Sequence, residues 1–569
     1  MKNLLIDRLA SEVRTVELMS HMREFARWIK LSGTPEEEKA FRYIDKKLTS
    51  YGFRTQTILH DAYISLPGDA SIEIDGRIIA CITHSHARPS AQGGTNGDVI
   101  YVGECGPADI EGRDLKGRIL LIDGMAVPQA AYLASRAGAI GQIHITPDDY
   151  LHEMCVSPIW GSPSVETLDR LPSTVITTIS RADGAELRDR LSRGERVSAT
   201  LHAQVDTGWR QTPILVADLD GPNGAADPFV LFAAHVDTWH YGVMDNGGAN
   251  ATMLEVARIC AQHSDSWRRG IRLCFWSGHS HGRYSGSTWY ADQNWAELER
   301  RCALHVNIDS TGGRGATIVS NTGAAPELRQ FASDIIAAET GQSFAGRRVG
   351  RQGDQSFWGI GVPTMFGSLS HQPRPEGHQG HHLHLGWWWH TPGDTLDNID
   401  EAILARDTRI YLRTVWRLLT DPVLPFDYGT HLDDLATELG AIAPRLAEDC
   451  PVDALIEETA RLREAISTMM AHAADADAVQ AERLNRALMA ISRSLVPVES
   501  STGDRFGHDP ALSQPAWPAL QPLRALSKTQ VNSDEACFSV VSAVRARNRV
   551  AYALREAKAV CERFMANKT

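Results

Sequence analysis

The sequence lacks several features that would assign it to a specialised class of protein. None of its 569 residues lie in an uninterrupted apolar run approaching the roughly 18 residues that a membrane-spanning helix needs. The N-terminus has no apolar core of roughly 7–15 residues, so it does not resemble a secretory signal, and a cytoplasmic protein is expected. The 9 cysteines form no CxxC pair, which favours reduced thiols over a disulfide framework or a thiolate metal site.

The composition also lacks an excess of positive charge. A net charge of −13 and a pI near 5.9 disfavour a nucleic-acid-binding protein, which normally carries a basic face. The apolar fraction of 43% and the charged fraction of 22% are ordinary for a soluble globular chain. We therefore expect a small-molecule or peptide substrate, no nucleic acid and no membrane partner.

The length and the changing texture of the chain predict three domains. Apolar runs that alternate with helical segments over residues 213–309 predict an α/β domain with a mostly parallel, covered sheet. Short apolar runs separated by Gly, Pro and Asp predict an inserted β-rich module, and helical periodicity dominates the C-terminal part. The predicted boundaries are residues 1–59 and 206–425 for the α/β domain, 60–205 for the insert and 426–569 for the helical domain.

Four polar residues follow predicted strands or a long loop of the α/β domain. His235 ends the apolar run VLFAAH, Asp309 ends LHVNI, Asp245 lies in a Gly-rich turn, and His390 follows three tryptophans. Ligand sites in open α/β sheets gather at the carboxyl ends of strands, and imidazole and carboxylate are ligands that suit zinc. Asp237, two residues after His235, can orient that histidine. The pattern predicts a metal site.

The motifs HVDTWHYGVMDNGG, NIDS and HTPGDTLDNID, in this order, resemble the zinc aminopeptidase and glutamate carboxypeptidase family, the M28 type of metallopeptidase. The resemblance implies two zinc ions bridged by an aspartate, with a glutamate as general base. It implies that His235, Asp245 and Asp309 bind one metal, that Asp245 bridges to a second metal bound by His390, and that Asp237 is the catalytic aspartate.

The resemblance extends to the other two predicted domains. DLKGRILLIDG and RAGAIGQIHI are similar to the protease-associated domain inserted in larger members of the family. LNRALMAISRSLVPV, followed by a Pro-Trp-Pro stretch, resembles the helical domain of the glutamate carboxypeptidase and transferrin-receptor branch. This resemblance implies a homodimer that forms through the helical domain.

The chain departs from the family where the general base is expected. Ser277-Gly278-His279-Ser280-His281 follows the strand that ends at Trp276, so His279 occupies the position of the base and Ser280 that of a glutamate ligand. If the ligand is lost, one metal or none is expected. If His279 or His281 replaces it, the site also suits iron or manganese. Zinc, as one or two ions, is the expected cofactor, with iron or manganese as alternatives.

Three further residues are predicted to contact the substrate. Trp239 and Trp389 flank matched ligands and can form an aromatic wall, and Arg351 can pair with a substrate carboxylate. The loop before His390 carries five more histidines, which we interpret as a solvated His-rich segment: His371, His378, His381, His382 and His384.

The leading hypothesis is a metal-dependent hydrolase that acts on an amide-type bond of a small molecule or peptide. In this hypothesis His279 accepts a proton in place of the usual glutamate, because the ordinary pKa of histidine lies near working pH. Two alternatives stay open, namely a non-hydrolytic metal enzyme such as a lyase or oxygenase, and a catalytically inactive peptidase-like binding protein.

Overall fold

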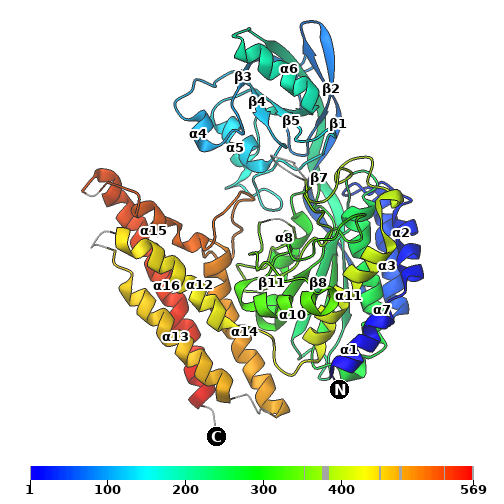
Figure 1. The fold of residues 1–569 in the computed structure, drawn as a ribbon, viewed down its shortest axis with the longest axis vertical. Helices are drawn as coiled ribbons and strands as arrows, with labels where there is room; N and C mark the ends of the chain where they lie inside the picture. Colours follow the sequence, from blue (N-terminus) through cyan, green and yellow to red (C-terminus); the bar gives the residue numbers. More distant parts are fainter. Residues whose placement is uncertain are drawn as a thin grey trace.

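The computed structural model describes three regions of the chain, which Figure 1 shows as an α/β body, a lobe above it and a group of long helices beside it. The described residues are 2–351, 353–374, 383–446, 450–472, 477–530 and 532–566. No described helix has both the length and the apolar character needed to cross a membrane.

The α/β body is built on a mixed sheet whose centre is parallel. Strand β8 pairs in parallel with β9 and β10, β10 pairs in parallel with β11, and β7 joins the edge of β9 in antiparallel orientation. The strands are β7 (Ser198–Leu219), β8 (Phe229–His235), β9 (Gly270–Trp276), β10 (Cys302–Asn307) and β11 (Thr364–Met365). Every residue of β8 and β9 is buried, as expected for strands covered on both faces. The predicted mostly parallel, covered sheet is confirmed.

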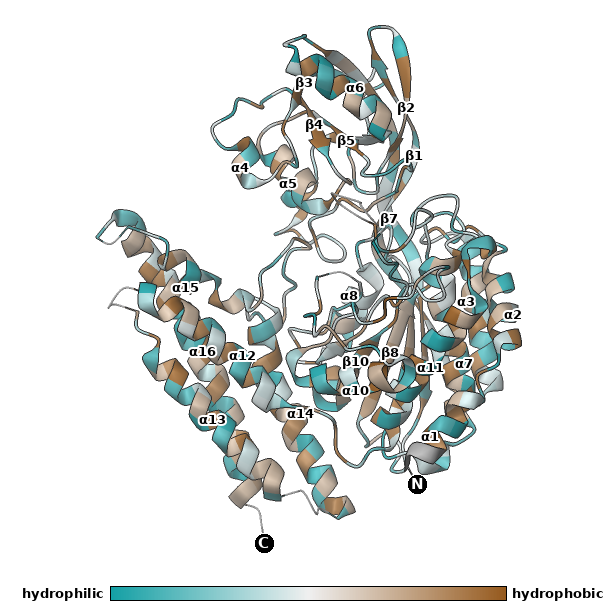
Figure 2. Cartoon of the chain, viewed as in Figure 1, coloured by the Kyte–Doolittle hydropathy of each residue, from teal (hydrophilic) through white to brown (hydrophobic). Residues whose placement is uncertain are grey.

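Helices cover both faces of this sheet. Successive side chains of each strand point to opposite faces, so the apolar strands pack against helices on both sides. Val230 and Phe232 pack in one cluster with residues of the helices on one face, whereas Phe229 and Leu231 pack with Tyr290 on the other. The first face carries α1 (Lys2–Ser11), α2 (Thr15–Phe25), α3 (Pro35–Ser50), α7 (Ala249–Ala261), α10 (Arg329–Thr340) and α11 (Glu401–Thr420); the second carries α8 (Ser285–Gln293) and α9 (Trp295–Arg301). Hydrophobic residues concentrate on the central strands in Figure 2.

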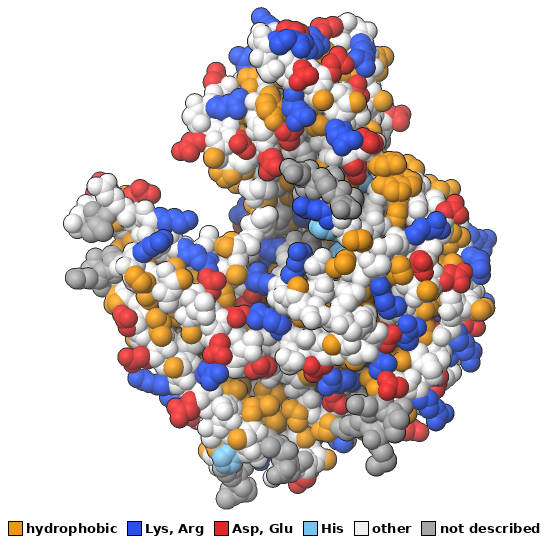
Figure 3. Space-filling view, in the orientation of Figure 1, with side chains coloured by type: hydrophobic (Ala, Val, Ile, Leu, Met, Phe, Trp, Pro, Cys, Tyr) orange, Lys and Arg blue, Asp and Glu red, His pale blue; other side chains and the backbone are white. Residues whose placement is uncertain are grey.

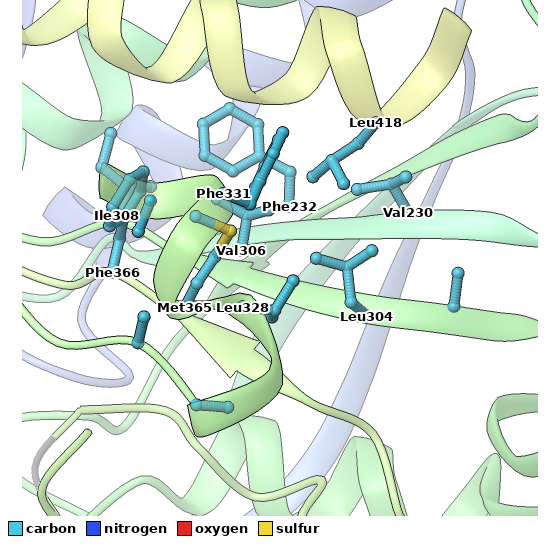
Figure 4. Packing of buried hydrophobic residues seen from close by; sticks show 14 of the residues in the cluster. Val230, Phe232, Leu304, Val306, Ile308, Leu328, Phe331, Met365, Phe366 and Leu418 are labelled. Atoms are coloured by element: carbon cyan, nitrogen blue, oxygen red, sulfur yellow. The ribbon is translucent and has the colours of Figure 1, made fainter. Parts of the chain in front are cut away.

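Replacing Phe232 by alanine is expected to destabilise the protein by about 3–5 kcal/mol, because a large side chain in a filled core leaves a cavity. Phe232 is fully buried and lies among Val230, Phe331 and Leu418 in Figure 4. The guanidinium midpoint of unfolding measures the effect. Leu59→Ala, at a side chain that is 64% exposed, is the control and should shift the midpoint little. Equal shifts for both variants would contradict the assignment of this core.

The lobe is connected to the body by a two-stranded ribbon. Strand β1 (Arg54–Ile74) pairs antiparallel with β7 along nearly its whole length. Both strands run through residues 60 and 205 without interruption, so the predicted boundaries of the insert fall inside the ribbon and stay a prediction. Above it lie β2 (Arg77–Thr83), β3 (Thr95–Tyr101), β4 (Ile119–Asp123), β5 (Gly141–Ile145), β6 (Val175–Ile179), α4 (Pro107–Ile110), α5 (Pro128–Arg136) and α6 (Arg181–Ser192).

The described part of the chain after residue 426 is mostly helical and contains no strand, as the sequence predicts. Its helices are α12 (Tyr428–Ile442), α13 (Asp453–His472), α14 (Ala478–Ser500), α15 (Gln521–Leu526) and α16 (Asp534–Ala566). Four apolar residues at helical spacing form one buried face of α14: Leu484, Leu488, Ile491 and Leu495. On the side of the molecule that Figure 3 shows, basic and acidic side chains are interspersed over the surface. The homodimer stays a prediction.

Candidate metal centre

His235 lies at the end of β8 and is buried. Its Nδ1 donates a hydrogen bond to the backbone carbonyl of Asp237 at 2.8 Å, so Nε2 carries the free lone pair. Nε2 is 3.3 Å from Oδ1 of Asp245 and 3.8 Å from Oδ2 of Asp309. Among the described residues it is a buried atom without a hydrogen-bond partner. One imidazole nitrogen and two carboxylates therefore converge on one point.

The electrostatics of this point favour a cation. Burial opposes a charged imidazole, but the carboxylates of Asp245 and Asp309 prevail and raise the pKa of His235 well above its ordinary value. The two carboxylates thus favour a positive charge at the point where they meet the imidazole. A divalent ion would satisfy the same charges and the free Nε2 together, so the residues fit a metal.

Asp245 faces two histidines with its two carboxylate oxygens. Its Oδ1 lies toward His235, and its Oδ2 lies 3.1 Å from Nε2 of His390. Nδ1 of His390 donates to the carbonyl of Glu153 at 2.7 Å, which leaves the Nε2 of this histidine free as well. This is the arrangement that the resemblance implies for a bridging aspartate.

The turn that carries Asp245, residues Val243–Gly248, is held by Asp394 and by its glycines. The carboxylate of Asp394 accepts hydrogen bonds from the backbone N–H of Met244 at 2.8 Å and of Asp245 at 3.0 Å. A Cβ on Gly248 would lie 2.3 Å from the carbonyl oxygen of Thr311, so only glycine fits where the turn enters α7.

The carboxylate of Asp237 contacts the loop after β9, rather than His235. Its Oδ1 is 3.8 Å from Nδ1 of His235, which bonds the backbone carbonyl instead. The carboxylate accepts hydrogen bonds from the backbone N–H of Ser280 at 2.8 Å and of His279 at 3.2 Å, and from Oγ of Ser32 at 2.7 Å. Asp237 therefore positions the segment that replaces the family's two glutamates.

His279 lies against the metal centre and has a carboxylate partner of its own. Its ring stacks on His235 with 3.7 Å between centroids, and ligand atoms of His235, His279 and Asp309 all lie within 4.8 Å of one another. Nδ1 of His279 donates to Oδ2 of buried Asp354 at 2.8 Å, while Oδ1 of Asp354 accepts from Ser287 at 2.8 Å. Burial opposes ionisation of Asp354, but His279 prevails and lowers the pKa of this carboxyl.

Ser280 and His281 lie beside the centre in different environments. Oγ of Ser280 is buried and has no hydrogen-bond partner among the described residues. Nδ1 of His281 is 3.0 Å from Oγ of Ser32, and its ring lies 4.3 Å from that of Trp239. Burial lowers the pKa of His281 to about 3, so it is neutral. His281 does not belong to the group of His235, His279 and Asp309, and its role as a metal ligand stays a prediction.

The three predicted substrate contacts occupy different positions. Trp239 is buried and packs against the rings of His281 and His390, which makes it a support for both. Trp389 is half-buried and stacks on His390 at 3.5 Å. Arg351 donates to the carbonyls of Asp509 at 2.7 Å and Pro510 at 3.1 Å, so its guanidinium holds that segment. Contact of any of them with a substrate stays a prediction.

In the His-rich loop, His378, His381 and His382 lie outside the described residues.

Two irregular segments of the lobe, around His86 and around His152, hold both loops of the centre. Nδ1 of His152 donates to the carbonyl of Trp389 at 2.6 Å, and the N–H of Glu153 donates to the carbonyl of His390 at 3.1 Å. Nε2 of His86 donates to the carbonyl of His281 at 3.2 Å. Histidine side chains are visible at this junction in Figure 3. Neither these contacts nor Asp354 are predicted from the sequence, although Asp354 lies only three residues after Arg351.

Comparisons with known proteins agree with this geometry. Residues 215–415 match the family model of peptidase family M28. The chain is 27% identical over 237 residues to the probable glutamate carboxypeptidase VP8 of Zea mays, covering 38% of this chain and 32% of that protein. It is 21% identical over 509 residues to the probable glutamate carboxypeptidase AMP1 of Arabidopsis thaliana, covering 75% of this chain and 70% of that protein. The chain thus spans about a third of the first relative's length and more of the second's.

Solved structures share the fold. A peptidase M28 precursor from Shewanella amazonensis superposes with a TM-score of 0.57 at 20% identity, covering 73% of this chain and 96% of that one. The zinc aminopeptidase BSAP from Bacillus subtilis superposes with a TM-score of 0.55 at 20% identity, covering 72% of this chain and 96% of that one. The matches confirm the resemblance to M28-type metallopeptidases and the α/β fold class.

Proposed function

We propose that this M28-type chain is a metal-dependent hydrolase that cleaves an amide bond in a peptide or a small peptide-like molecule. The observation that carries the proposal is the buried, unpartnered Nε2 of His235 facing the carboxylates of Asp245 and Asp309. These ligand types suit zinc, with iron or manganese as alternatives. A metal ion held there supplies Lewis-acid polarisation of the scissile carbonyl and acidifies a water molecule.

In this proposal His279 takes the role of the general base. Its Nδ1–H is held by Asp354, so the opposite nitrogen, Nε2, is the one that can accept a proton. Asp354 keeps the ring in this tautomer and stabilises the imidazolium that forms, as a carboxylate behind a catalytic histidine does in other enzymes. Asp237 supports the base by holding its backbone N–H.

We propose one tightly bound ion rather than two. Asp245 and His390 form half of a second site, but serine stands at position 280, where the resemblance implies a glutamate ligand. Two protein ligands are few for a structural or catalytic zinc ion, which usually has three or four. Dimerisation through the helical region and a cytoplasmic location stay predictions from the sequence.

Removing the metal is expected to abolish hydrolysis and to lower the melting temperature, because the ion stabilises only the folded protein, in which its ligands converge. Elemental analysis before and after chelation measures the metal, and release of the amine from aminoacyl or dipeptide amides measures the reaction. Re-addition of zinc should restore both activity and stability. A purified protein without any transition metal, whose melting temperature does not respond to chelation, would contradict the proposal.

A non-hydrolytic iron enzyme is the second candidate. It is favoured by the group of His235, His279 and Asp309, because two histidines and one carboxylate are the ligands of non-haem iron oxygenases. In that case His279 binds the metal rather than accepting a proton. Elemental analysis that finds only zinc, together with amide hydrolysis, excludes this candidate.

A further inference from the structure

A chain of hydrogen bonds leads from the carboxylate of Asp354 to a tryptophan of the lobe, Trp160. Oδ1 of Asp354 accepts from Oγ of Ser287 at 2.8 Å, and that Oγ lies 2.8 Å from Oγ of Ser356. Nε1 of Trp160 donates to the same Oγ of Ser356 at 2.9 Å. The other oxygen of Asp354 accepts from Nδ1 of His279. Trp160 is therefore connected, through two serine hydroxyls, to the carboxylate that holds His279.

The donors of this chain all point in one direction, toward the carboxylate. An indole N–H only donates, so Ser356 accepts from Trp160 and directs its own proton elsewhere. Oγ of Ser287, at 2.8 Å, is a nearer acceptor for that proton than Oγ1 of Thr288, at 3.3 Å. An ionised carboxylate only accepts, so the hydroxyl of Ser287 donates to Asp354. Because neither end of the chain can reverse, the indole N–H fixes which way both hydroxyls point.

The chain is closed off from water. The side chains of Trp160, Ser356, Ser287 and Asp354 are all buried. Solvent therefore does not replace a donor that is removed, and a buried polar group left without its partner is costly. Hydrogen bonds in such a low-dielectric chain also polarise one another, so the loss of a donor at one end weakens the bond at the other.

Ring contacts hold Trp160 in the orientation that the chain requires. The guanidinium of Arg351 lies 4.3 Å from the centre of its ring, and the ring of Tyr284 lies 4.4 Å away. Tyr284 in turn meets the ring of His279 edge-on at 4.9 Å. The backbone N–H of Gly161, the next residue, donates to the carbonyl of Arg283 at 2.7 Å. The indole is thus fixed to the loop that carries His279.

We propose that Trp160 is a positioning residue for the reaction. Its indole N–H orients both serine hydroxyls toward Oδ1 of Asp354, which keeps the carboxylate from rotating and presents Oδ2 to Nδ1 of His279. The inference rests on the proposed function, in which His279 is the general base. A residue of the lobe thereby sets the orientation of the base, although it contacts neither the metal ligands nor the base by a hydrogen bond of its own.

The competing assignment is that Trp160 only fills space between the lobe and the α/β body. A side chain that only packs contributes to the free energy of unfolding, and its loss leaves kcat unchanged in the molecules that are folded. The two assignments therefore differ in whether removal of the indole N–H, with an aromatic ring retained, changes the rate.

Trp160→Phe tests the inference, because phenylalanine keeps an aromatic ring in place and lacks the N–H. It is expected to lower kcat for amide cleavage by the metal-loaded protein about 3- to 10-fold, the range that one hydrogen bond supports, with KM and metal content nearly unchanged. Trp295→Phe is the matched control, because it removes an indole N–H that donates to the carbonyl of Arg505 at 3.0 Å, outside the chain. This control should leave kcat unchanged.

Ser287→Ala makes the test specific to the chain. It removes the donor to Asp354 and should lower kcat at least as much as Trp160→Phe does. If Trp160 acts through Ser287, the double variant should be no slower than Ser287→Ala alone, because the connection is already broken. Losses that add in the double variant would overturn the inference, as would a Trp160→Phe protein with a lower melting temperature and an unchanged kcat.

Proton NMR follows the same hydrogen bond without any cleavage. The Nδ1 proton that His279 donates to Asp354 should give a downfield signal that His279→Ala removes. Trp160→Phe and Ser287→Ala should shift this signal, whereas Trp295→Phe should leave it in place. Absence of the signal from the wild-type protein, or a signal that Trp160→Phe does not move, contradicts the inference. A protein that hydrolyses no amide but shows the shift would refute the proposed reaction and leave the role of Trp160 in holding His279 intact.

Discussion

Replacing His235 by alanine is expected to remove the bound metal and to lower hydrolysis about a thousandfold or more. His235 offers its free Nε2 to the point where Asp245 and Asp309 meet, and its removal leaves the two carboxylates without the nitrogen ligand. Stabilisation of the transition state by a metal amounts to several kcal/mol, and each 1.36 kcal/mol is about tenfold in rate. Elemental analysis and the initial rate of amide cleavage measure the two effects.

An exposed histidine provides the control for this experiment. His472 lies at the end of α13, and His472→Ala should change neither the metal content nor the rate. The melting temperature of metal-free His235→Ala should lie close to that of the chelated wild-type protein, because both lack the ion. If His235→Ala keeps its metal and its activity, the centre lies elsewhere in the molecule.

Replacing His279 by alanine is expected to lower kcat about 100- to 10,000-fold while the metal content stays unchanged. This range is typical for the loss of a general base. The ring of His279 stacks on that of His235 and is turned by Asp354 so that one nitrogen remains free. Because the base acts in the transition state, KM should change much less than kcat.

Asp354→Asn separates positioning from proton transfer. An asparagine can present its amide N–H to Nδ1 of His279 and so reverse the tautomer, which should lower kcat about 10- to 100-fold with metal retained. Asp292→Asn, at a half-exposed residue of α8, is the control. Loss of metal from His279→Ala would assign this histidine as a ligand and would favour the iron enzyme over the hydrolase.

The lobe contributes to the centre through side chains and backbone alike. His86 and His152 bond the carbonyls of the two loops that carry the candidate ligands, and Glu153 adds a carboxylate. Burial lowers the pKa of His86 to about 4, so this histidine stays neutral and its contact persists at neutral pH. The loops of the centre are therefore held by a part of the chain that carries none of the metal-ligand motifs.

Much of the fold could be predicted because its causes are local in the chain. The buried strands β8, β9 and β10 appear as unbroken apolar runs, since both faces of the sheet are covered. A polar residue directly after such a run lies at the edge of the sheet, which is why the sequence predicts His235 and Asp309 as metal ligands. The glycines after Asp245 likewise follow from a tight turn into a helix.

The partners of these residues depended on the tertiary structure. Asp354 meets His279 across 75 residues of sequence, and Glu153 meets His390 across 237, and no periodicity in a single sequence pairs such positions. The sequence alone determined the residue types at the centre and the strand ends that carry them. The folded chain decided that the Asp237 carboxylate holds the 279–280 backbone and that the lobe supplies Glu153, because only packing brings distant segments within hydrogen-bonding distance.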